Sequence, residues 1–247
     1  MLFAVLFLPL TMRLGFWQLS RADEKQALLD IYQQRAAAPL LPLRQVPGDG
    51  DWQYLRVTLS GQYDNRVTLL LDNRVRRGRP GYEVVSVFRP VSGAAILVNR
   101  GWIAGGLYRS ILPQVDLVEG QVTLSGYLYR SPGKQVMLGA DPWQADKALQ
   151  IIQNAAPEVA SERFGETFNN YSLRLDATAP GALQTGWYVV GVKPEKHRGY
   201  AVQWFAMAIL LVVLTVLANS NLAVLWHSRR SRSRALSKVV ETSFDKK

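Results

Sequence analysis

The sequence HRGYAVQWF at residues 197–205 opens an apolar segment, and residues 199–226 carry no charged side chain. A helix that crosses the hydrocarbon core of a membrane needs about 20 apolar residues, so this segment is long enough to span one. Aromatic rings settle at the headgroup level, and three of them stand at the start of the segment: Tyr200, Trp204 and Phe205. We therefore predict a transmembrane helix over residues 200–226.

Four arginines just beyond this segment set its direction: Arg229, Arg230, Arg232 and Arg234. Such a basic cluster stays on the cytoplasmic side of a membrane, so the helix is expected to run from outside to inside. Residues 227–247 then form a basic cytoplasmic tail, in which His227 is interpreted as part of the flank. His197 is expected at the outer end of the helix.

Residues 1–20 form a second apolar stretch, interrupted by Pro9 and Arg13. A helix of this length is about 30 Å long, which is just enough to span a membrane. The stretch has neither the basic start nor the small-residue cleavage site of a signal peptide, which favours an uncleaved anchor over a cleaved signal. Arg13 is within reach of the outer face, where its charge could snorkel to water.

Residues 21–199, between the two apolar segments, have a plausible length for one folded domain. They begin with a stretch rich in helix formers, residues 21–38. We expect this stretch to continue the first anchor as a helix that Pro39 and Pro42 end.

From residue 52 the hydrophobic period changes from 3.6 to 2, which is typical of β-strands. Short strands separated by Gly and Asn turns predict an antiparallel sheet or a small barrel. The first two are expected to be joined by a turn at Asp64-Asn65. The predicted strands lie at residues 56–60, 67–71, 83–89, 95–102, 122–129 and 187–192.

Residues 141–156 (DPWQADKALQIIQNAA) predict a helix within this domain. Asp141 is its expected N-cap, Pro142 its first residue and Pro157 its stop. The predicted fold class is an α+β membrane protein, in which two transmembrane helices flank a β-rich, antiparallel, barrel-like periplasmic domain with one or two helices.

The net charge of +10 is concentrated beside the predicted spans. Arg13 and the tail beyond Trp226 account for +6 of it, while the remaining region carries 21 basic against 17 acidic residues. A basic excess beside a span is better explained by topology and anionic lipid than by nucleic acid. We therefore expect the lipid bilayer, and no nucleic acid, as a partner.

The sequence offers no recognisable catalytic or multidentate metal site. It contains no cysteine and two histidines, which excludes disulfides, thiolate catalysis, the C-x-x-C-H haem attachment motif and a multi-histidine metal site. Nucleophile-elbow, phosphate-loop and dinucleotide motifs are also missing. We expect a protein that is not an enzyme.

His197 is the strongest candidate binding residue because of its position. A neutral imidazole is a good axial ligand for haem iron. The residues beside His197 could wall the porphyrin (Tyr200, Trp204 and Phe205) and pair with its two propionates (Lys193, Lys196 and Arg198). The alternative is that the aromatic rings only anchor the helix while the cations meet lipid phosphate.

The run NRVRRGRPG at residues 73–81 carries four arginines within a Gly/Pro turn. We interpret it as a solvated hairpin tip. It could instead bind propionates, lipid phosphate or an acidic partner surface.

Four blocks of this sequence, in this order, resemble the Surfeit locus protein one family of cytochrome c oxidase assembly factors. The first is residues 14–21 (LGFWQLSR) with Lys25, and the third is residues 96–103 (ILVNRGWI). The second comprises residues 61–63, 71–74, Gly78 and 81–82, and the fourth is His197 with residues 200–205 (YAVQWF).

The resemblance implies two membrane helices around an outward-facing domain, with both termini inside. It implies a chaperone without turnover that binds haem a and assists its insertion into the catalytic oxidase subunit. In bacterial members the histidine that opens the last helix is implicated in haem a binding, and here it matches His197. The family's tyrosine and tryptophan match Tyr200 and Trp204. Two further blocks match with positional or structural roles alone: Gly15, Trp17 and Gln18, and Asn99, Arg100, Gly101 and Trp102.

With no mitochondrial presequence ahead of the first helix, the expected location is a bacterial inner membrane. The expected partners are the catalytic subunit of cytochrome c oxidase and the machinery that makes haem a. Two alternative functions remain. One is a haem-free scaffold that stabilises an oxidase subunit, and the other is a membrane-tethered periplasmic enzyme.

Overall fold

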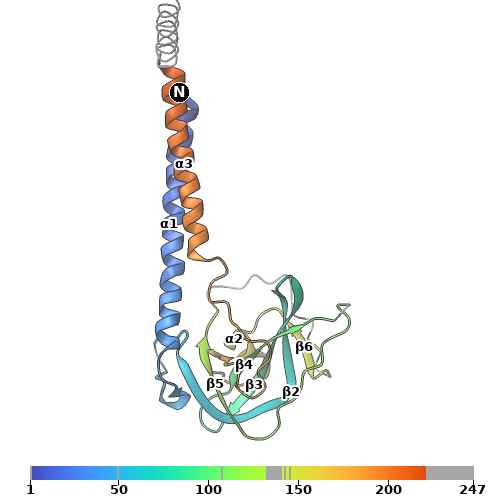
Figure 1. Cartoon of the computed structure of the whole chain (residues 1–247). Coiled ribbons are helices and arrows are strands. Elements are labelled where there is room, and N and C mark those ends of the chain that lie inside the picture. The colour runs from blue at the N-terminus through green and yellow to red at the C-terminus, as the bar shows by residue number, and fades with distance from the viewer. Residues whose placement is uncertain are drawn as a thin grey trace, which may run out of the picture. The chain divides into compact units, whose positions relative to one another are not determined.

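The computed structural model describes residues 2–48, 50–106, 108–131, 141, 143–144 and 146–220. The predicted cytoplasmic tail, His227 and Pro142 therefore lie outside the described residues. The chain separates into two compact units, one formed by residues 1–29 and 190–247 and the other by residues 30–189 (Figure 1).

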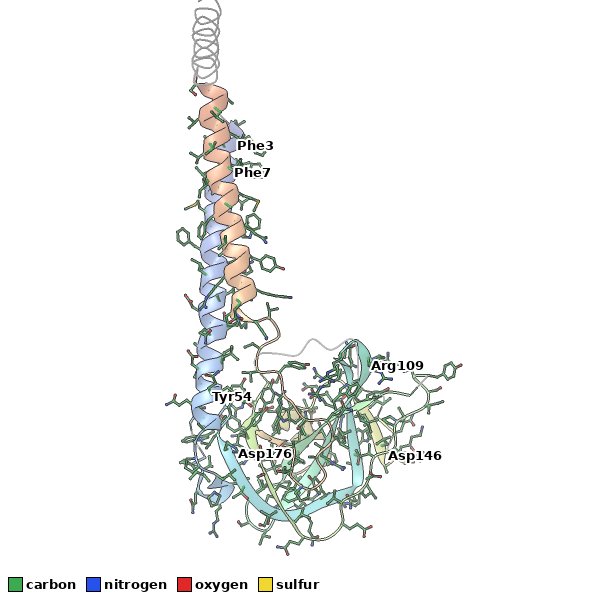
Figure 2. The ribbon with its side chains drawn as sticks, in the orientation of Figure 1. Phe3, Phe7, Tyr54, Arg109, Asp146 and Asp176 are labelled. Atoms are coloured by element: carbon green, nitrogen blue, oxygen red, sulfur yellow. The ribbon has the colours of Figure 1, made fainter. Side chains whose placement is uncertain are left out.

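The first unit contains the helix α3 (Pro194–Asn219) and the residues of the helix α1 (Leu2–Ala36) up to Leu29. By length and composition alone, both could cross a membrane. The predicted helical continuation of the first anchor is confirmed, because α1 runs without a break to Ala36 and Pro39 follows. At its N-terminal end Phe3 and Phe7 stack, with ring centroids 4.2 Å apart (Figure 2).

Helices α1 and α3 lie side by side (Figure 1) and meet through small residues. Five of these are buried: Thr11, Gly15, Ala22, Ala201 and Ala208. Small side chains let helix backbones approach closely in a membrane, where apolar burial alone does not drive association. The ring of Phe205 covers Gly15 and meets the ring of Phe16 edge-on, with centroids 5.2 Å apart.

The second unit is β-rich. Its elements are β1 (Leu41–Pro42), η1 (Leu43–Gln45), β2 (Arg56–Arg76), β3 (Arg79–Pro90), β4 (Ile96–Ala104), β5 (Val122–Tyr129), β6 (Leu149–Ile152), α2 (Pro157–Phe164) and β7 (Ser172–Leu175). Strand pairing follows the order β1-β2-β3-β4-β7-β5, and β5 also pairs with β2, so the path returns to β2. The predicted antiparallel pairing is found for β2–β3, β2–β5, β3–β4 and β5–β7. The prediction is wrong for β1–β2, β2–β6 and β4–β7, which are parallel pairs.

The turn predicted at Asp64-Asn65 is also wrong, because both residues lie inside the continuous strand β2. The register with β3 shifts between Asp64 and Thr68, as it does where an extra residue bends a strand. Polar residues therefore mark an irregularity here and not a chain reversal. The bend lets one strand pair with β5 in its first half and with β6 in its second.

The chain reverses instead at Arg77-Gly78, between β2 and β3. Both residues have positive φ, 50° and 76°, which is the conformation that a two-residue hairpin turn requires. The interpretation of residues 73–81 as a hairpin tip is confirmed.

The helix predicted at residues 141–156 is wrong, because Leu149–Ile152 forms strand β6. The carboxylate of Asp141 does not cap a helix. It accepts hydrogen bonds from the backbone N–H of Gln153, at 2.8 Å, and from the guanidinium of Arg163, at 3.1 Å. Pro157, expected to stop a helix, begins α2, where a missing N–H costs nothing.

The last strand was expected at residues 187–192, and this too is wrong. Trp187 lies outside any strand, and its indole Nε1 donates to the carbonyl of Leu175, 3.0 Å away. That carbonyl ends β7, the short strand that the alternation did not indicate. Trp187 is thus hydrogen-bonded to the end of a strand without being part of one.

The core of this unit is formed by side chains from both halves of β2. One cluster joins its first half to β5 and β7 through Val57, Leu124 and Leu173, each fully buried. A second cluster packs its second half against β4, β6 and α2 through Leu69, Leu97, Ile152 and Ala160. Burial of these apolar side chains supplies the main driving force for folding the domain.

Candidate functional site

The site is built where α3 begins. Lys193 is the N-cap residue, with φ −68° and ψ 147°, and Pro194 occupies the first helical position. Proline is suited to this position because its fixed φ is already helical and it has no N–H to leave unpaired. The following residues, including His197, are therefore held in regular helix from the first turn.

His197 contacts Gln18 of α1. Its ring Nδ1 lies 2.7 Å from Oε1 of the glutamine, and the imidazole is half-buried. An amide oxygen can only accept a hydrogen bond, so Nδ1 must carry the hydrogen. In the neutral imidazole, Nε2 then keeps its lone pair. This is the tautomer that a metal-binding histidine uses, with the second ring nitrogen held by a carbonyl oxygen.

Gln18 and His197 each lie on the helix face that carries the small buried residues. Gln18 shares one face of α1 with Thr11, Gly15 and Ala22, at the spacing of residues that stack on a helix face. His197 has the same spacing to Ala201, Trp204 and Ala208 on α3. The hydrogen bond therefore lies within the close-packed interface of α1 and α3, which holds the imidazole in place.

The other predicted site residues surround His197 with different exposure. Helix α3 contains Tyr200, Trp204 and Phe205, so their predicted helical conformation is confirmed. Tyr200 is 47% exposed, whereas the other two rings are half-buried. The three predicted cations are exposed and form no ion pair within the part of the chain that the structure describes: Lys193, Lys196 and Arg198.

Sequence reasoning gave Gln18 only a positional role. The signal that could have identified it is a long polar side chain on the small-residue stripe of an apolar helix, where an amide needs a partner. Among the described residues no group of three or more histidine or acidic side chains is arranged to hold a metal ion. A metal centre at this site would therefore depend on the imidazole of His197.

The Asn-Arg-Gly-Trp block of residues 99–102 holds the β-rich unit together. Asn99 donates from Nδ2 to Glu83, at 2.7 Å, and accepts from the N–H of Gly101. Arg100 is buried and donates to two backbone carbonyls. Burial lowers the pKa of its guanidinium. The indole of Trp102 donates to the carbonyl of Arg74, so all three polar side chains of this block bond within the unit, which fits a structural role.

Comparison with known proteins gives consistent results. The model of the SURF1 family matches residues 5–209. A SURF1-like protein of Rickettsia prowazekii is 29% identical over 224 residues, which cover 85% of this chain and 86% of the relative. An uncharacterized SURF1-like protein of Mycobacterium bovis is 28% identical over 202 residues, covering 78% and 72%. The Surfeit locus protein 1 of Takifugu rubripes is 24% identical over 229 residues, covering 83% and 90%.

Proposed function

This chain belongs to the SURF1 family, and from that membership we propose that it binds haem a at the outer face of a bacterial inner membrane and assists its insertion into the catalytic subunit of cytochrome c oxidase. Members of the family are known generally as cytochrome oxidase assembly factors and not as catalysts. The resemblance read from the four sequence blocks is thereby confirmed at the level of the family. Haem binding is the further step that the site residues must support.

The single observation that carries the proposal is the hydrogen bond between Gln18 and His197. It leaves Nε2 as a lone-pair donor and fixes the plane of the ring. Partners of this kind raise the basicity of a histidine ligand and typically improve metal affinity by about tenfold to a hundredfold.

The remaining residues of the site fit the chemistry of a haem. Lys193, Lys196 and Arg198 are exposed, so their charges are available to propionate groups without breaking an ion pair among the described residues. Tyr200 and Trp204 offer apolar ring faces beside them. The haem a macrocycle supplies the iron and is carried as cargo. The role of the protein is to bind it, orient it and keep its hydrophobic tail within lipid.

The proposed topology places residues 21–199 in the periplasm, the two helices in the membrane and both termini in the cytoplasm. It is supported by two helices that could span and by the arginines that follow Trp226 in the sequence. The return of the strand path to β2 supports the barrel-like form proposed for the outer domain. The proposed partners are the catalytic oxidase subunit, the machinery that makes haem a and the bilayer.

The test is oxidase assembly in a bacterium that lacks this protein and is complemented with variants. His197→Ala is compared with wild type and with His227→Ala, which removes the other histidine of the chain. We expect His197→Ala to be present in the membrane at wild-type level but to lower the haem a content of the purified oxidase. His227→Ala should restore it fully.

Undiminished oxidase assembly by His197→Ala would contradict haem carriage through this residue. It would indicate the haem-free scaffold instead. Loss of the His197→Ala protein from the membrane would show that the residue stabilises the helix pair and would also count against the proposal.

A further inference from the structure

A cleft of 570 Å³ lies within the β-rich unit, separate from the residues of the proposed haem site. Its walls come from β2, β3, β4 and β7, from the end of β5 and from the first turn of α2. The volume falls in the range of sites that bind small organic molecules. What distinguishes this cleft is the charge of the side chains that line it.

Three arginines line the cleft, and none of them has a carboxylate partner within the described residues: Arg74, Arg130 and Arg174. The Nε atoms of Arg74 and Arg174 are buried and make no hydrogen bond. A buried polar atom without a partner costs free energy unless a bound group supplies one. Elsewhere in the same unit comparable arginines are paired, as Arg163 is with Asp141.

Aromatic rings hold two of these guanidinium groups in place. The guanidinium carbon of Arg174 lies 3.3 Å from the ring centre of Tyr129 and 4.9 Å from that of Trp187. Arg130 lies over Tyr171, at 4.5 Å, and donates from Nε to a backbone carbonyl. Stacking orients a guanidinium while leaving its N–H fork free for a planar or tetrahedral anion.

Two carboxylates also line the cleft, and neither forms an ion pair with a cleft arginine. Glu83 accepts a hydrogen bond from Asn99, and Glu158 is exposed. The start of α2 adds to the positive potential. Its N-cap, Ala156, has no side chain that could cap the first N–H groups, and these groups form the positive end of the helix dipole.

We propose that this cleft binds an organic anion that carries a carboxylate or phosphate group on an apolar body. The arginines bind the anionic group, which supplies the partner that the buried Nε atoms of Arg74 and Arg174 lack. The apolar body contacts Leu71, Val85 and Val159, which line the same cleft. This site does not depend on haem binding at His197.

The test is calorimetric titration of the full chain in zwitterionic lipid nanodiscs with three probes. Inorganic phosphate tests the anionic group alone, phenyl phosphate adds an apolar body, and 3-phenylpropionate replaces phosphate by carboxylate. We expect both aromatic anions to bind, and to bind more tightly than inorganic phosphate. The difference between them identifies the anionic group that the cleft prefers.

Arg74→Gln and Arg130→Gln should each weaken binding by roughly tenfold to a hundredfold, because each removes a charge-assisted hydrogen bond. Arg79→Gln is the matched control, since Arg79 is exposed, has the same charge and lies outside the cleft. Arg130 is exposed too, so its variant should fold even if Arg74→Gln does not. His197→Ala should bind the probes as wild type does, which separates this site from the haem proposal.

Absence of binding by all three probes at millimolar concentration would overturn the proposal. So would binding that is equal in wild type, Arg74→Gln and Arg130→Gln. Binding of inorganic phosphate as tight as that of phenyl phosphate would overturn the role of the apolar wall.

Discussion

Gln18 and His197 are 179 positions apart in the sequence, and the Oε1 atom of one lies 2.7 Å from the Nδ1 atom of the other. The contact determines which nitrogen of the imidazole carries its hydrogen. Because the glutamine belongs to one apolar helix and the histidine to the other, the ring can keep this tautomer only while the two helices stay together. A binding site at His197 is therefore coupled to the packing of α1 against α3.

Replacing Gln18 by leucine tests this coupling, because it keeps the size of the side chain and removes the acceptor. We expect Gln18→Leu to lower haem a affinity by roughly tenfold to a hundredfold and to shift the absorption bands of the bound haem. Gln18→Glu, which keeps an acceptor, should restore most of the affinity. Titration of purified protein with haem a measures both variants.

The control is Gln203→Leu, which removes an exposed glutamine from α3. Equal affinity in Gln18→Leu and Gln203→Leu would show that the hydrogen bond has no influence on the ligand.

A substitution at Gly15 tests the packing of α1 against α3. A Cβ atom at this position would lie 2.6 Å from the ring of Phe205, so the ring must move and lose its edge contact with Phe16. We expect Gly15→Ala to destabilise the helix pair by about 1–3 kcal/mol, the usual cost of overpacking. The measurement is the thermal unfolding midpoint in detergent.

Gly199→Ala is the matched substitution on α3, because a Cβ there meets no atom within 4 Å. It should leave the midpoint unchanged or raise it slightly, as alanine favours a helix. If both variants melt alike, the close approach at Gly15 does not stabilise the pair. Adding Phe205→Leu to Gly15→Ala should recover part of the loss.

Asp64 should make the folding stability of the β-rich unit depend on pH. The guanidinium of Arg66, together with that of Arg89, holds the pKa of this carboxyl well below its ordinary value. The ionised form therefore stabilises the folded state above the unfolded pKa of about 4, and this contribution is lost as the pH falls below that value. We expect Asp64→Asn to lower stability by about 1 kcal/mol at pH 7.

Thermal midpoints at pH 7 and pH 2.5 check this expectation. The difference between wild type and Asp64→Asn should shrink at the lower pH, because the carboxyl of the unfolded chain is protonated there while the folded state still holds it ionised. A constant difference across this range would mean that the side chain acts through its shape and not its charge.

Asp141 should contribute strongly to the folding stability of the β-rich unit. Its side chain is 1% exposed and accepts hydrogen bonds from Arg163 and from the backbone of Gln153. Asp141→Ala leaves both donors without an acceptor, and we expect a loss of about 2–4 kcal/mol. Glu24→Ala, which removes one member of an exposed pair with Arg21, should change the midpoint little.

Much of the fold could be predicted from local patterns. The apolar segments, the strands over residues 83–89, 95–102 and 122–129, and the hairpin tip at Arg77-Gly78 depend on periodicity and turn chemistry within a few residues. The errors arose where distant partners decide the conformation. Residues 149–152 are strand because β2 pairs with them, and Gln150 bonds to the carbonyls of Gln144 and Lys147.

The candidate site shows the same limit. His197 could be predicted from its place at the start of an apolar helix, together with the cations and rings beside it. The role of Gln18 could not, because a hydrogen bond between two helices depends on their register. Of the cleft arginines, Arg74 lies in a run that the sequence indicated as a possible anion site. Its grouping with Arg130 and Arg174 could not be predicted, since the three come from β2, from the residue after β5 and from β7.

The most direct test of haem binding is the haem a content of the purified full chain, expressed in cells that make haem a. We predict that wild-type protein copurifies with haem a, that His227→Ala retains it, and that His197→Ala loses most of it while remaining in the membrane. Haem a bound in equal amount and with an unchanged spectrum in His197→Ala would contradict the proposed function.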